Sequence, residues 1–269
     1  MRREMGVGSL KISLMITLYN WKEALDLVLL SAIRQSRLPD EILIADDGSD
    51  DDTRALIDSF RSRTTVPINH VWHEDIGFRK STIQNLALVT TECDYIVQID
   101  GDIVMHPHFI ADHARFAKEG CYLQGYRCKL DKETTDRMLE TKEIKFRPSL
   151  KGMFSSQRTF RSVLLNYLTL KEKLSMKRII GCNTSFWRSD ALLVNGYDED
   201  MVGWGAQDQE FSARLIHNGI KQRRLRFSAR EYHLDHPNVK RDPVEGRWDA
   251  FGNTLEKRLK RCANGIEKF

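Results

Sequence analysis

The stretch Tyr95-Ile-Val-Gln-Ile-Asp-Gly-Asp102 is a short apolar run that ends abruptly in two aspartates on either side of a glycine. Its apolar part is too short for a helix and has the length of a buried strand. Comparable runs and segments with helical spacing alternate through the first half of the chain, which predicts further strands at 11–18, 42–45 and 69–72 and helices at 22–35, 53–62 and 81–89. This alternation predicts an α/β fold with a mostly parallel sheet and helices on both faces.

Acidic residues directly follow two of these strands. Asp46 and Asp47 come after the second strand, and Asp100 and Asp102 end the fourth. Because ligands of parallel sheets gather beyond the carboxyl ends of the strands, we expect both pairs at one edge of the sheet. Two carboxylates around Gly101 can hold a hard divalent cation, and such a cation can stabilise a diphosphate leaving group. An exposed acidic turn is the alternative interpretation.

Two neighbouring loops carry groups that suit a nucleobase. Thr17 and Tyr19 lie at and after the end of the first strand, and Asp47 follows the second. An aromatic ring can stack on a base while a carboxylate accepts a hydrogen bond from a base N–H group. The alternative is structural: Asn20 caps a helix, and Asp47 belongs to a turn built on aspartate and glycine.

Later in the chain, Trp204 lies between two glycines, and Gln207 and Asp208 follow at the expected start of a helix over 207–218. A carboxylate beside an aromatic platform suits a sugar, whose ring can stack while its hydroxyl loses a proton. The alternative is an ordinary helix start with acidic residues near its positive end. His233 and His236 follow in a Tyr-His-Leu-Asp-His sequence. They can be metal ligands, and the alternative is that they are polar residues of a loop.

Bulk properties exclude several classes of protein. The 269 residues carry 42 Lys and Arg against 38 Asp and Glu, a net charge of +4 that is too balanced to indicate nucleic acid binding. Five cysteines, an odd number without a CxxC pair, argue against a disulfide framework or a zinc site. The chain shows no signal peptide and no apolar run long enough to span a membrane, so we expect a cytoplasmic protein.

Basic residues cluster at 221–226 and 256–261. A solvated surface is one interpretation of these runs, and a surface that meets anionic lipid or an anionic glycan is the other. The second would make a basic C-terminal helix, expected at about 253–269, a peripheral contact with an anionic membrane.

Several motifs in one order resemble a known family. TLYN at 17–20, ILIADDGS at 42–49 and QIDGD at 98–102 look like the donor half of family 2 glycosyltransferases with the GT-A fold. GCNTSFWR at 181–188 and GWGAQDQE at 203–210 look like the acceptor half of galactosyl- and N-acetylgalactosaminyl-transferases, shared with bacterial chondroitin polymerases and lipopolysaccharide or capsule glycosyltransferases.

The resemblance implies roles for the donor half. Thr17, Tyr19 and Asp47 would contact the uracil and ribose of a UDP-sugar. Arg79 would lie near the donor nucleotide or its phosphates, and Asp100 near the ribose or the metal.

The resemblance also implies a metal site and an acceptor site. Asp102 and His233, with His236 as the alternative, would hold Mn²⁺ or Mg²⁺. Trp204 would line the acceptor sugar, and Asp208 would be the base of an inverting transfer. The family usually has an acidic pair at 207–208, and here Gln207 takes the first place, where it can only hydrogen-bond an acceptor hydroxyl.

The whole chain, 1–269, would then be a single GT-A glycosyltransferase domain. It would have a donor-binding half at about 9–126, a helical insertion at about 129–177 and an acceptor half at about 178–240. The reaction would transfer a hexose or N-acetylhexosamine from a UDP-sugar to a glycan or lipid-linked glycan, in lipopolysaccharide or surface polysaccharide synthesis. The alternatives are a binding protein without turnover and a sugar nucleotidyltransferase.

Overall fold

The computed structural model describes residues 10–145, 153–154, 160–177, 179–201, 203, 205–236 and 247–269. The strands are β1 (Ile12–Leu18), β2 (Glu41–Asp46), β3 (Ile68–Trp72), β4 (Tyr95–Asp100), β5 (Ile103–Met105), β6 (Cys121–Gln124), β7 (Cys128–Leu130), β8 (Met153–Phe154), β9 (Glu172–Lys173), β10 (Thr184–Trp187), β11 (Lys221–Arg224) and β12 (Glu231–His233). The helices are α1 (Lys22–Ala32), α2 (Asp51–Arg61), α3 (Lys80–Thr90), α4 (Phe109–Phe116), α5 (Lys132–Thr141), α6 (Val163–Thr169), α7 (Arg188–Leu193), α8 (Gln207–His217) and α9 (Arg247–Glu256), with short 3-10 turns at Gly181–Asn183 and Ile266–Lys268.

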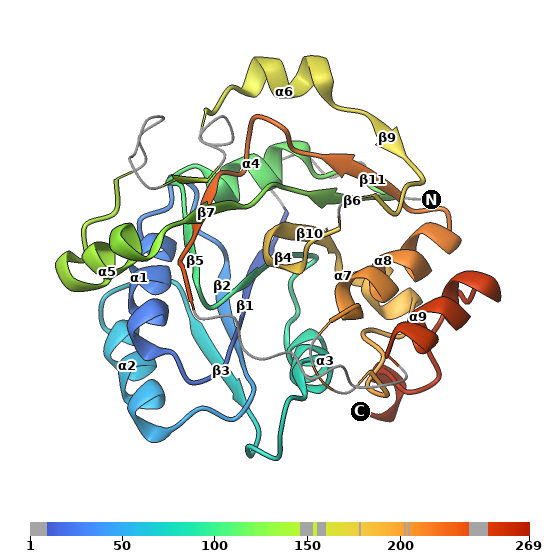
Figure 1. The fold of residues 1–269 in the computed structure, drawn as a ribbon, viewed down its shortest axis with the longest axis horizontal. Coiled ribbons are helices and arrows are strands. Elements are labelled where there is room, and N and C mark those ends of the chain that lie inside the picture. Colours follow the sequence, from blue (N-terminus) through green and yellow to red (C-terminus); the bar gives the residue numbers. More distant parts are fainter. Residues whose placement is uncertain are drawn as a thin grey trace.

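An eight-stranded sheet forms the centre of the molecule, in the order β3-β2-β1-β4-β10-β6-β11-β9 (Figure 1). The first four strands are parallel, whereas β10 runs antiparallel to both of its neighbours. A smaller sheet, β5-β12-β7-β8, stands beside it. The expected α/β fold with a mainly parallel sheet is therefore confirmed, and its second half is mixed.

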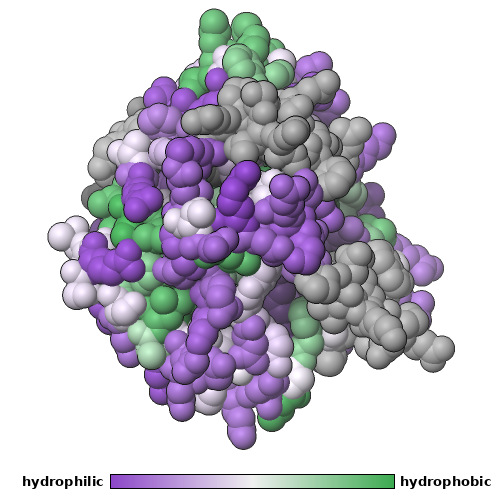
Figure 2. Space-filling view, turned by 60° about the vertical axis from the view of Figure 1, so that its left-hand side comes forward, coloured by the Kyte–Doolittle hydropathy of each residue, from purple (hydrophilic) through white to green (hydrophobic). Residues whose placement is uncertain are grey.

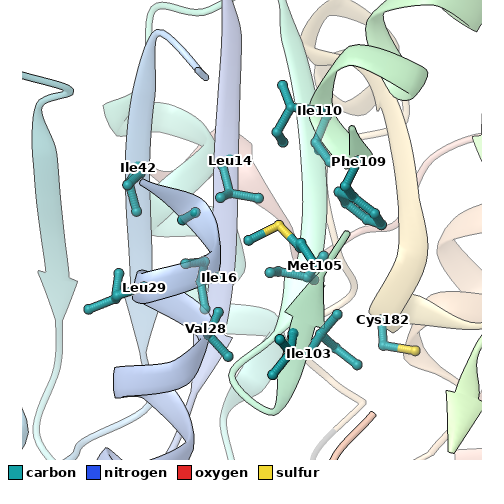
Figure 3. Close-up of a cluster of buried hydrophobic side chains, with 14 of the residues drawn as sticks. Leu14, Ile16, Val28, Leu29, Ile42, Ile103, Met105, Phe109, Ile110 and Cys182 are labelled. Atoms are coloured by element: carbon teal, nitrogen blue, oxygen red, sulfur yellow. The ribbon is translucent and has the colours of Figure 1, made fainter. Parts of the chain in front are cut away.

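Alternate side chains of the parallel strands enter two different cores, one on each face of the sheet. Leu14 and Ile16 of β1 pack with Val28 and Leu29 of α1 in the larger core (Figure 3). Met15, between them, enters the second core with residues of α3, α7 and α8. A strand buried on both faces has no polar alternation, which is why the sequence of β1 reads as a continuous apolar run.

The structure differs from the sequence in some helix boundaries. The helix expected at 53–62 begins earlier, because Asp50 caps α2 through a hydrogen bond that its carboxylate accepts from the Thr53 amide at 3.0 Å. The expected basic C-terminal helix over 253–269 is wrong in its extent. The helix α9 ends at Glu256, and the basic run at 257–261 leaves it with Arg258 in a left-handed conformation (φ 50°) that a helix cannot continue.

The region 129–177, expected to be a helical insertion, contains helices α5 and α6 and also the short strands β8 and β9, which the sequence did not indicate. β8 extends the small sheet beside β7, and β9 pairs with the edge of the large sheet at β11. Within the described residues, no helix has the length and apolar character needed to cross a bilayer. Each of the five cysteines, all in the described part of the chain, is a buried free thiol.

Candidate active site

The carboxyl ends of β1, β2 and β4 bring the predicted donor residues together. The register pairs Thr17 with Asp100 and Leu18 with Asp46. The amide of Gly101 donates a hydrogen bond to the Thr17 carbonyl at 2.8 Å. A Cβ atom at Gly101 would come within 2.8 Å of Leu18 Cβ, so a side chain there would push the acidic turn away from β1. The glycine between the two aspartates therefore allows the close approach of the turn to the first strand.

Asp102, His233 and His236 form a cluster whose possible ligand atoms all lie within 4.8 Å of one another. The Nε2 atoms of both histidines are 3.5 Å from Asp102 Oδ2. The pairing of β5 with β12 makes this possible, because it places His233 opposite Ile103, the residue after Asp102. The sequence could not choose between the two histidines, and the structure brings both to the same carboxylate.

The cluster has the chemistry of a divalent-cation site. Asp102 Oδ1 is buried and has no hydrogen-bond partner among the described residues. His233 Nδ1 is 2.8 Å from the Leu234 carbonyl oxygen, so it carries the proton and leaves the Nε2 lone pair facing Asp102. Burial and the charge of Asp100 raise the pKa of Asp102 to about 7, and burial lowers the pKa of His233 to about 4. A neutral imidazole and an unsatisfied carboxylate oxygen are the groups that a bound cation would stabilise.

Lys80, which the sequence interpretation missed, lies near both Asp100 and Asp208. Lys80 Nζ is 2.7 Å from Asp100 Oδ1. Burial opposes its positive charge, but the charges of Asp100 and Asp208 outweigh that effect and hold the pKa of Lys80 above its ordinary value. Lys80 therefore remains a cation and links Asp100 electrostatically to Asp208. In the sequence, a role for Lys80 in the site could be suspected only from its position next to Arg79, at the start of α3.

Asp208, the predicted base, lies in the first turn of α8. Its Oδ1 accepts a long hydrogen bond from Gln98 Nε2, at 3.4 Å, and its carboxylate packs against Gly181. Burial raises the pKa of Asp208, while the charge of Lys80 lowers it. The Asp208 carboxylate therefore lies near Lys80 and Asp100, and its burial favours the acceptance of a proton.

Gln207 does not point at an open acceptor site in this structure. Its Oε1 accepts a hydrogen bond from the Gly205 amide at 2.9 Å, and its Nε2 donates to the carbonyls of Met201 and Gly203. The side chain therefore braces the loop that carries the expected acceptor platform. Trp204, the residue expected to line the acceptor sugar, lies outside the described residues.

The predicted nucleoside residues lie on neighbouring loops with different exposure. Tyr19 is 53% exposed, and its hydroxyl donates to Asp75 Oδ2 at 2.8 Å. Asp47 is buried, with its oxygens 2.7 Å from His73 Nε2 and 3.0 Å from the backbone amide of Arg79. The Arg79 guanidinium instead donates to the Glu74 carbonyl at 2.7 Å.

The structural alternative for Asn20 is wrong, because the N-cap of α1 is Trp21. The side-chain oxygen of Asn20 instead accepts a hydrogen bond from the Asp50 amide at 3.1 Å, which joins the two loops. Thr17 is buried below them, with its hydroxyl 3.5 Å from Gln84 Nε2. The loops after β1, β2 and β3 thus form one connected surface around Asp47.

A second residue missed by the sequence interpretation is Glu231, two positions before His233 on β12 and therefore on the same face of that strand. Only 1% of its surface is exposed, and neither carboxylate oxygen has a hydrogen-bond partner among the described residues. Burial, followed by the charge of Asp102, raises the pKa of Glu231 well above its usual range. A carboxylate at the start of a three-residue strand gives no sequence signal of this kind.

Two family models and several curated proteins match this chain. A model described as glycosyl transferase family 2 matches residues 13–188, and one described as the N-terminal domain of galactosyltransferase matches residues 161–237. Among curated relatives, validoxylamine A glucosyltransferase of Streptomyces hygroscopicus subsp. limoneus is 27% identical over 222 residues, which are 78% of this chain and 48% of that protein. Chondroitin synthase of Escherichia coli is 23% identical over 242 residues, 84% of this chain and 35% of that protein.

Two solved structures share the fold. The S. aureus TarS fragment 1–349 in complex with UDP-GlcNAc superimposes with a TM-score of 0.62 at 15% identity, covering 96% of this chain and 69% of that one. The mannosyltransferase PcManGT of Pyrobaculum calidifontis, in complex with GDP-Man and Mn²⁺, gives 0.59 at 15% identity, covering 86% and 58%. The chain spans about half, or less, of the length of the curated relatives named above.

Proposed function

The chain belongs to glycosyl transferase family 2, and on that premise we propose that it is a metal-dependent, inverting glycosyltransferase that uses a UDP-sugar. The observation that carries the proposal is the convergence of Asp102, His233 and His236 at the carboxyl edge of the parallel strands. In this family context, a cation site at the end of β4 is where a nucleotide diphosphate would bind.

The donor nucleoside is proposed to occupy the connected loops after β1, β2 and β3. Tyr19 offers an exposed ring for stacking on uracil, and the buried Thr17 and Asp47 would be polar partners for the base and ribose. Arg79 donates its backbone amide to Asp47, and its guanidinium would lie near the donor nucleotide or its phosphates. Asp100 would face the ribose or the metal, with its charge balanced by Lys80.

Asp102, His233 and His236 would hold the cation. Mn²⁺ suits a mixed set of carboxylate and imidazole ligands better than Mg²⁺, which prefers oxygen alone. The cation would supply positive charge to the leaving diphosphate. Structures with the same fold have been solved with UDP-GlcNAc and with GDP-Man and Mn²⁺.

Asp208 is proposed to be the general base. An acceptor hydroxyl oxygen would form the new bond to the anomeric carbon, its proton would pass to the Asp208 carboxylate, and the bond from that carbon to the diphosphate oxygen would break on the opposite face. Attack from the face opposite the leaving group inverts the anomeric configuration. We propose that Trp204 lines the acceptor sugar and that Gln207 acts indirectly, by bracing the loop of residues 201–205.

The transferred sugar is proposed to be a hexose or N-acetylhexosamine, and the acceptor a glycan or lipid-linked glycan of a lipopolysaccharide or surface polysaccharide. The support is the presence of a chondroitin synthase and of a validoxylamine A glucosyltransferase among the relatives.

The test is UDP release from a panel of UDP-hexoses and UDP-N-acetylhexosamines, with Mn²⁺ or EDTA. Asp102→Asn is compared with wild type and with Asp136→Asn, a matched change on the exposed side of α5. The proposal predicts release from one donor that EDTA and Asp102→Asn abolish and Asp136→Asn leaves intact. Release that is indifferent to EDTA and to Asp102→Asn would refute metal dependence. No release from any donor with mixed glycan acceptors would favour a binding protein.

A further inference from the structure

A row of large apolar side chains lies exposed on and around α6. We call it the crest: it consists of Phe160, Leu164, Leu165, Tyr167, Leu168 and Leu174, which are between 37% and 72% exposed. In the ribbon, α6 stands at the top of the molecule, and the same end is a green, hydrophobic cap in the space-filling view (Figures 1 and 2). A grouped apolar surface of this kind marks an interaction site, whereas single exposed leucines do not.

The exposure of the crest is built into the fold. Ser162 caps α6 through the Leu165 amide, and its own amide donates to the Phe227 carbonyl at 2.7 Å. Asn166, in the middle of the helix, is buried and accepts a hydrogen bond from the Phe227 amide at 3.0 Å. The helix therefore turns this amide inward and its leucines outward, the reverse of the usual arrangement on a soluble surface.

Exposed lysines lie beside the crest, in the segment after α6 and on a neighbouring strand. Lys171, Lys173 and Lys177 are exposed in the segment that follows α6, and Lys221 is exposed on β11 next to β9. The single acidic residue of the described segment 160–177 is Glu172, whose carboxylate is held by Lys118 at 2.7 Å and faces Arg223 at 3.6 Å. Among the residues that the structure describes, these four lysines form no ion pair, so they leave positive charge beside an apolar surface.

From these observations we propose that the crest inserts into the surface of a bilayer containing anionic lipids. A peripheral membrane contact has two parts. Leucine and aromatic side chains enter the boundary between headgroups and acyl chains, and lysines lie at the anionic headgroups. A symmetric contact between two copies fits less well, because it would bring two lysine-rich surfaces together without acidic partners.

The basic C-terminal run is a poorer candidate for this contact than the crest. Two of its neighbouring cations are engaged within the chain, since Arg261 pairs with Glu267 and Lys268 pairs with Glu199. Of its large apolar residues, Leu255 is 39% exposed and Phe269 is 52% exposed, and they stand singly. The sequence suggested a membrane contact through the basic C-terminal run. The proposal assigns this contact to α6 and β9 instead.

The position of the crest would leave the donor site open to water. The loop between β3 and α3, which carries His73 and Arg79 beside Asp47, lies at the bottom of Figure 1, opposite α6. A protein bound through the crest would present this loop to the aqueous phase, from which a nucleotide-sugar arrives.

The test is co-sedimentation of the full chain with phosphatidylcholine vesicles that contain about 30 mol% phosphatidylglycerol, compared with vesicles of phosphatidylcholine alone. The double variant Leu164→Ser/Leu168→Ser removes the most exposed apolar side chains. Its matched control, Leu38→Ser/Leu193→Ser, changes leucines that are 41% and 47% exposed elsewhere. Lys171→Gln/Lys173→Gln is matched by Lys257→Gln/Lys260→Gln in the C-terminal run.

The proposal predicts that wild type binds the anionic vesicles, and that the crest leucine variant binds at least roughly tenfold more weakly. The Lys171/Lys173 variant should lose the preference for anionic lipid, and both controls should bind like wild type. UDP release by soluble protein should be the same for all variants, so this proposal can fail while the proposed function stands. Equal vesicle binding by the crest leucine variant and wild type would overturn the proposal. It would also be overturned if wild type did not bind vesicles and the crest leucine variant changed from dimer to monomer, because the crest would then be a contact between two copies.

Discussion

Gly181 lies directly against the carboxylate of Asp208: a Cβ atom at position 181 would come within 2.0 Å of Asp208 Oδ2. Gly181→Ala should therefore displace the proposed base while leaving the donor loops untouched. We expect kcat to fall by about 100-fold or more, because a base that is misplaced by about an ångström loses most of its effect. The affinity for the UDP-sugar, measured by calorimetry, should stay within about twofold of wild type.

Gly252→Ala is the matched control, since a Cβ atom at that position of α9 meets nothing within 4 Å. This control should keep wild-type turnover and equal or slightly higher stability. If Gly181→Ala retained full turnover, Asp208 would not be the base in the position the structure gives it.

A second prediction concerns pH. Burial raises the pKa of Asp208, and the positive charge of Lys80 opposes that rise. A general base works only when it is deprotonated, so turnover should fall as the pH drops through this raised pKa. Lys80→Met removes the opposing charge and should move the acidic limb of the kcat profile to higher pH. Lys80→Arg, which keeps the charge, should leave the limb closer to wild type.

Lys22→Met serves as the comparison for Lys80, because Lys22 pairs with Asp52 in a solvent-exposed ion pair. The profile of this variant should overlay that of wild type. An acidic limb that stays in place or moves downward in Lys80→Met would contradict the proposed electrostatic link between Lys80 and Asp208.

The histidines allow a third prediction, on metal affinity. His233 and His236 are equally far from Asp102 Oδ2, at 3.5 Å. If both are ligands, each change to alanine should weaken Mn²⁺ binding by roughly 10- to 100-fold, and Asp102→Asn by at least as much. Electron paramagnetic resonance of free Mn²⁺ measures this without turnover. His108→Ala is the control, and unchanged affinity in one histidine variant would leave the other as the ligand.

The sequence was sufficient to predict the parallel half of the sheet and the residues at its edge. β1, β2 and β4 are buried on both faces, which produces apolar runs that periodicity can identify, and parallel strands place their following loops together. The approach of Asp102 to His236 was beyond such reasoning. It depends on the antiparallel pairing of β5 with β12, two three-residue strands far apart in the chain.

Residues that act through tertiary contacts were also hidden from the sequence. Gln98 was expected as part of a buried strand, and only the fold shows that its amide contacts Asp208 and that its oxygen accepts from the Tyr197 hydroxyl at 2.6 Å. Gln207 was expected to hydrogen-bond an acceptor hydroxyl, whereas its partners in the structure are the backbone groups of its own loop. Hydrogen-bond capacity is a property of the residue type, whereas the choice of partner depends on packing.

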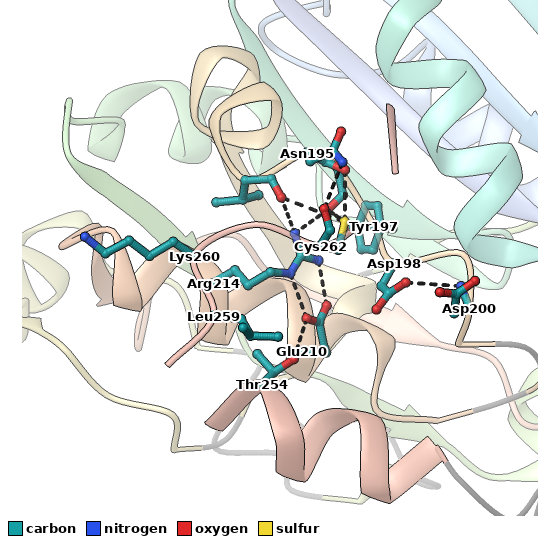
Figure 4. Close-up of polar contacts among 12 residues, drawn as sticks. Asn195, Tyr197, Asp198, Asp200, Glu210, Arg214, Thr254, Leu259, Lys260 and Cys262 are labelled. Atoms are coloured by element: carbon teal, nitrogen blue, oxygen red, sulfur yellow. Dashed lines mark hydrogen bonds and ion pairs between the residues drawn. The ribbon is translucent and has the colours of Figure 1, made fainter. Parts of the chain in front are cut away.

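The last prediction concerns the buried ion pair that holds α8 to the C-terminal part of the chain (Figure 4). Arg214 is fully buried and forms two hydrogen bonds with Glu210, at 2.7 and 2.6 Å, and its Nη1 donates to the carbonyls of Val194 and Gly196. The hydroxyl of Thr254, on α9, donates to Glu210 at 3.0 Å. Glu210→Ala would leave the Arg214 charge buried with only carbonyl partners, so the free energy of unfolding should fall by about 3–5 kcal/mol.

Arg261→Ala is the contrasting change, because Arg261 and Glu267 form an exposed pair whose loss should cost at most about 1 kcal/mol. Urea denaturation followed by circular dichroism measures both variants. The double variant Glu210→Leu/Arg214→Met removes both buried charges together and should be more stable than Glu210→Ala alone, because no uncompensated charge remains. If Glu210→Ala were no less stable than Arg261→Ala, the buried network would not hold α8 and α9 together in the way the contacts indicate.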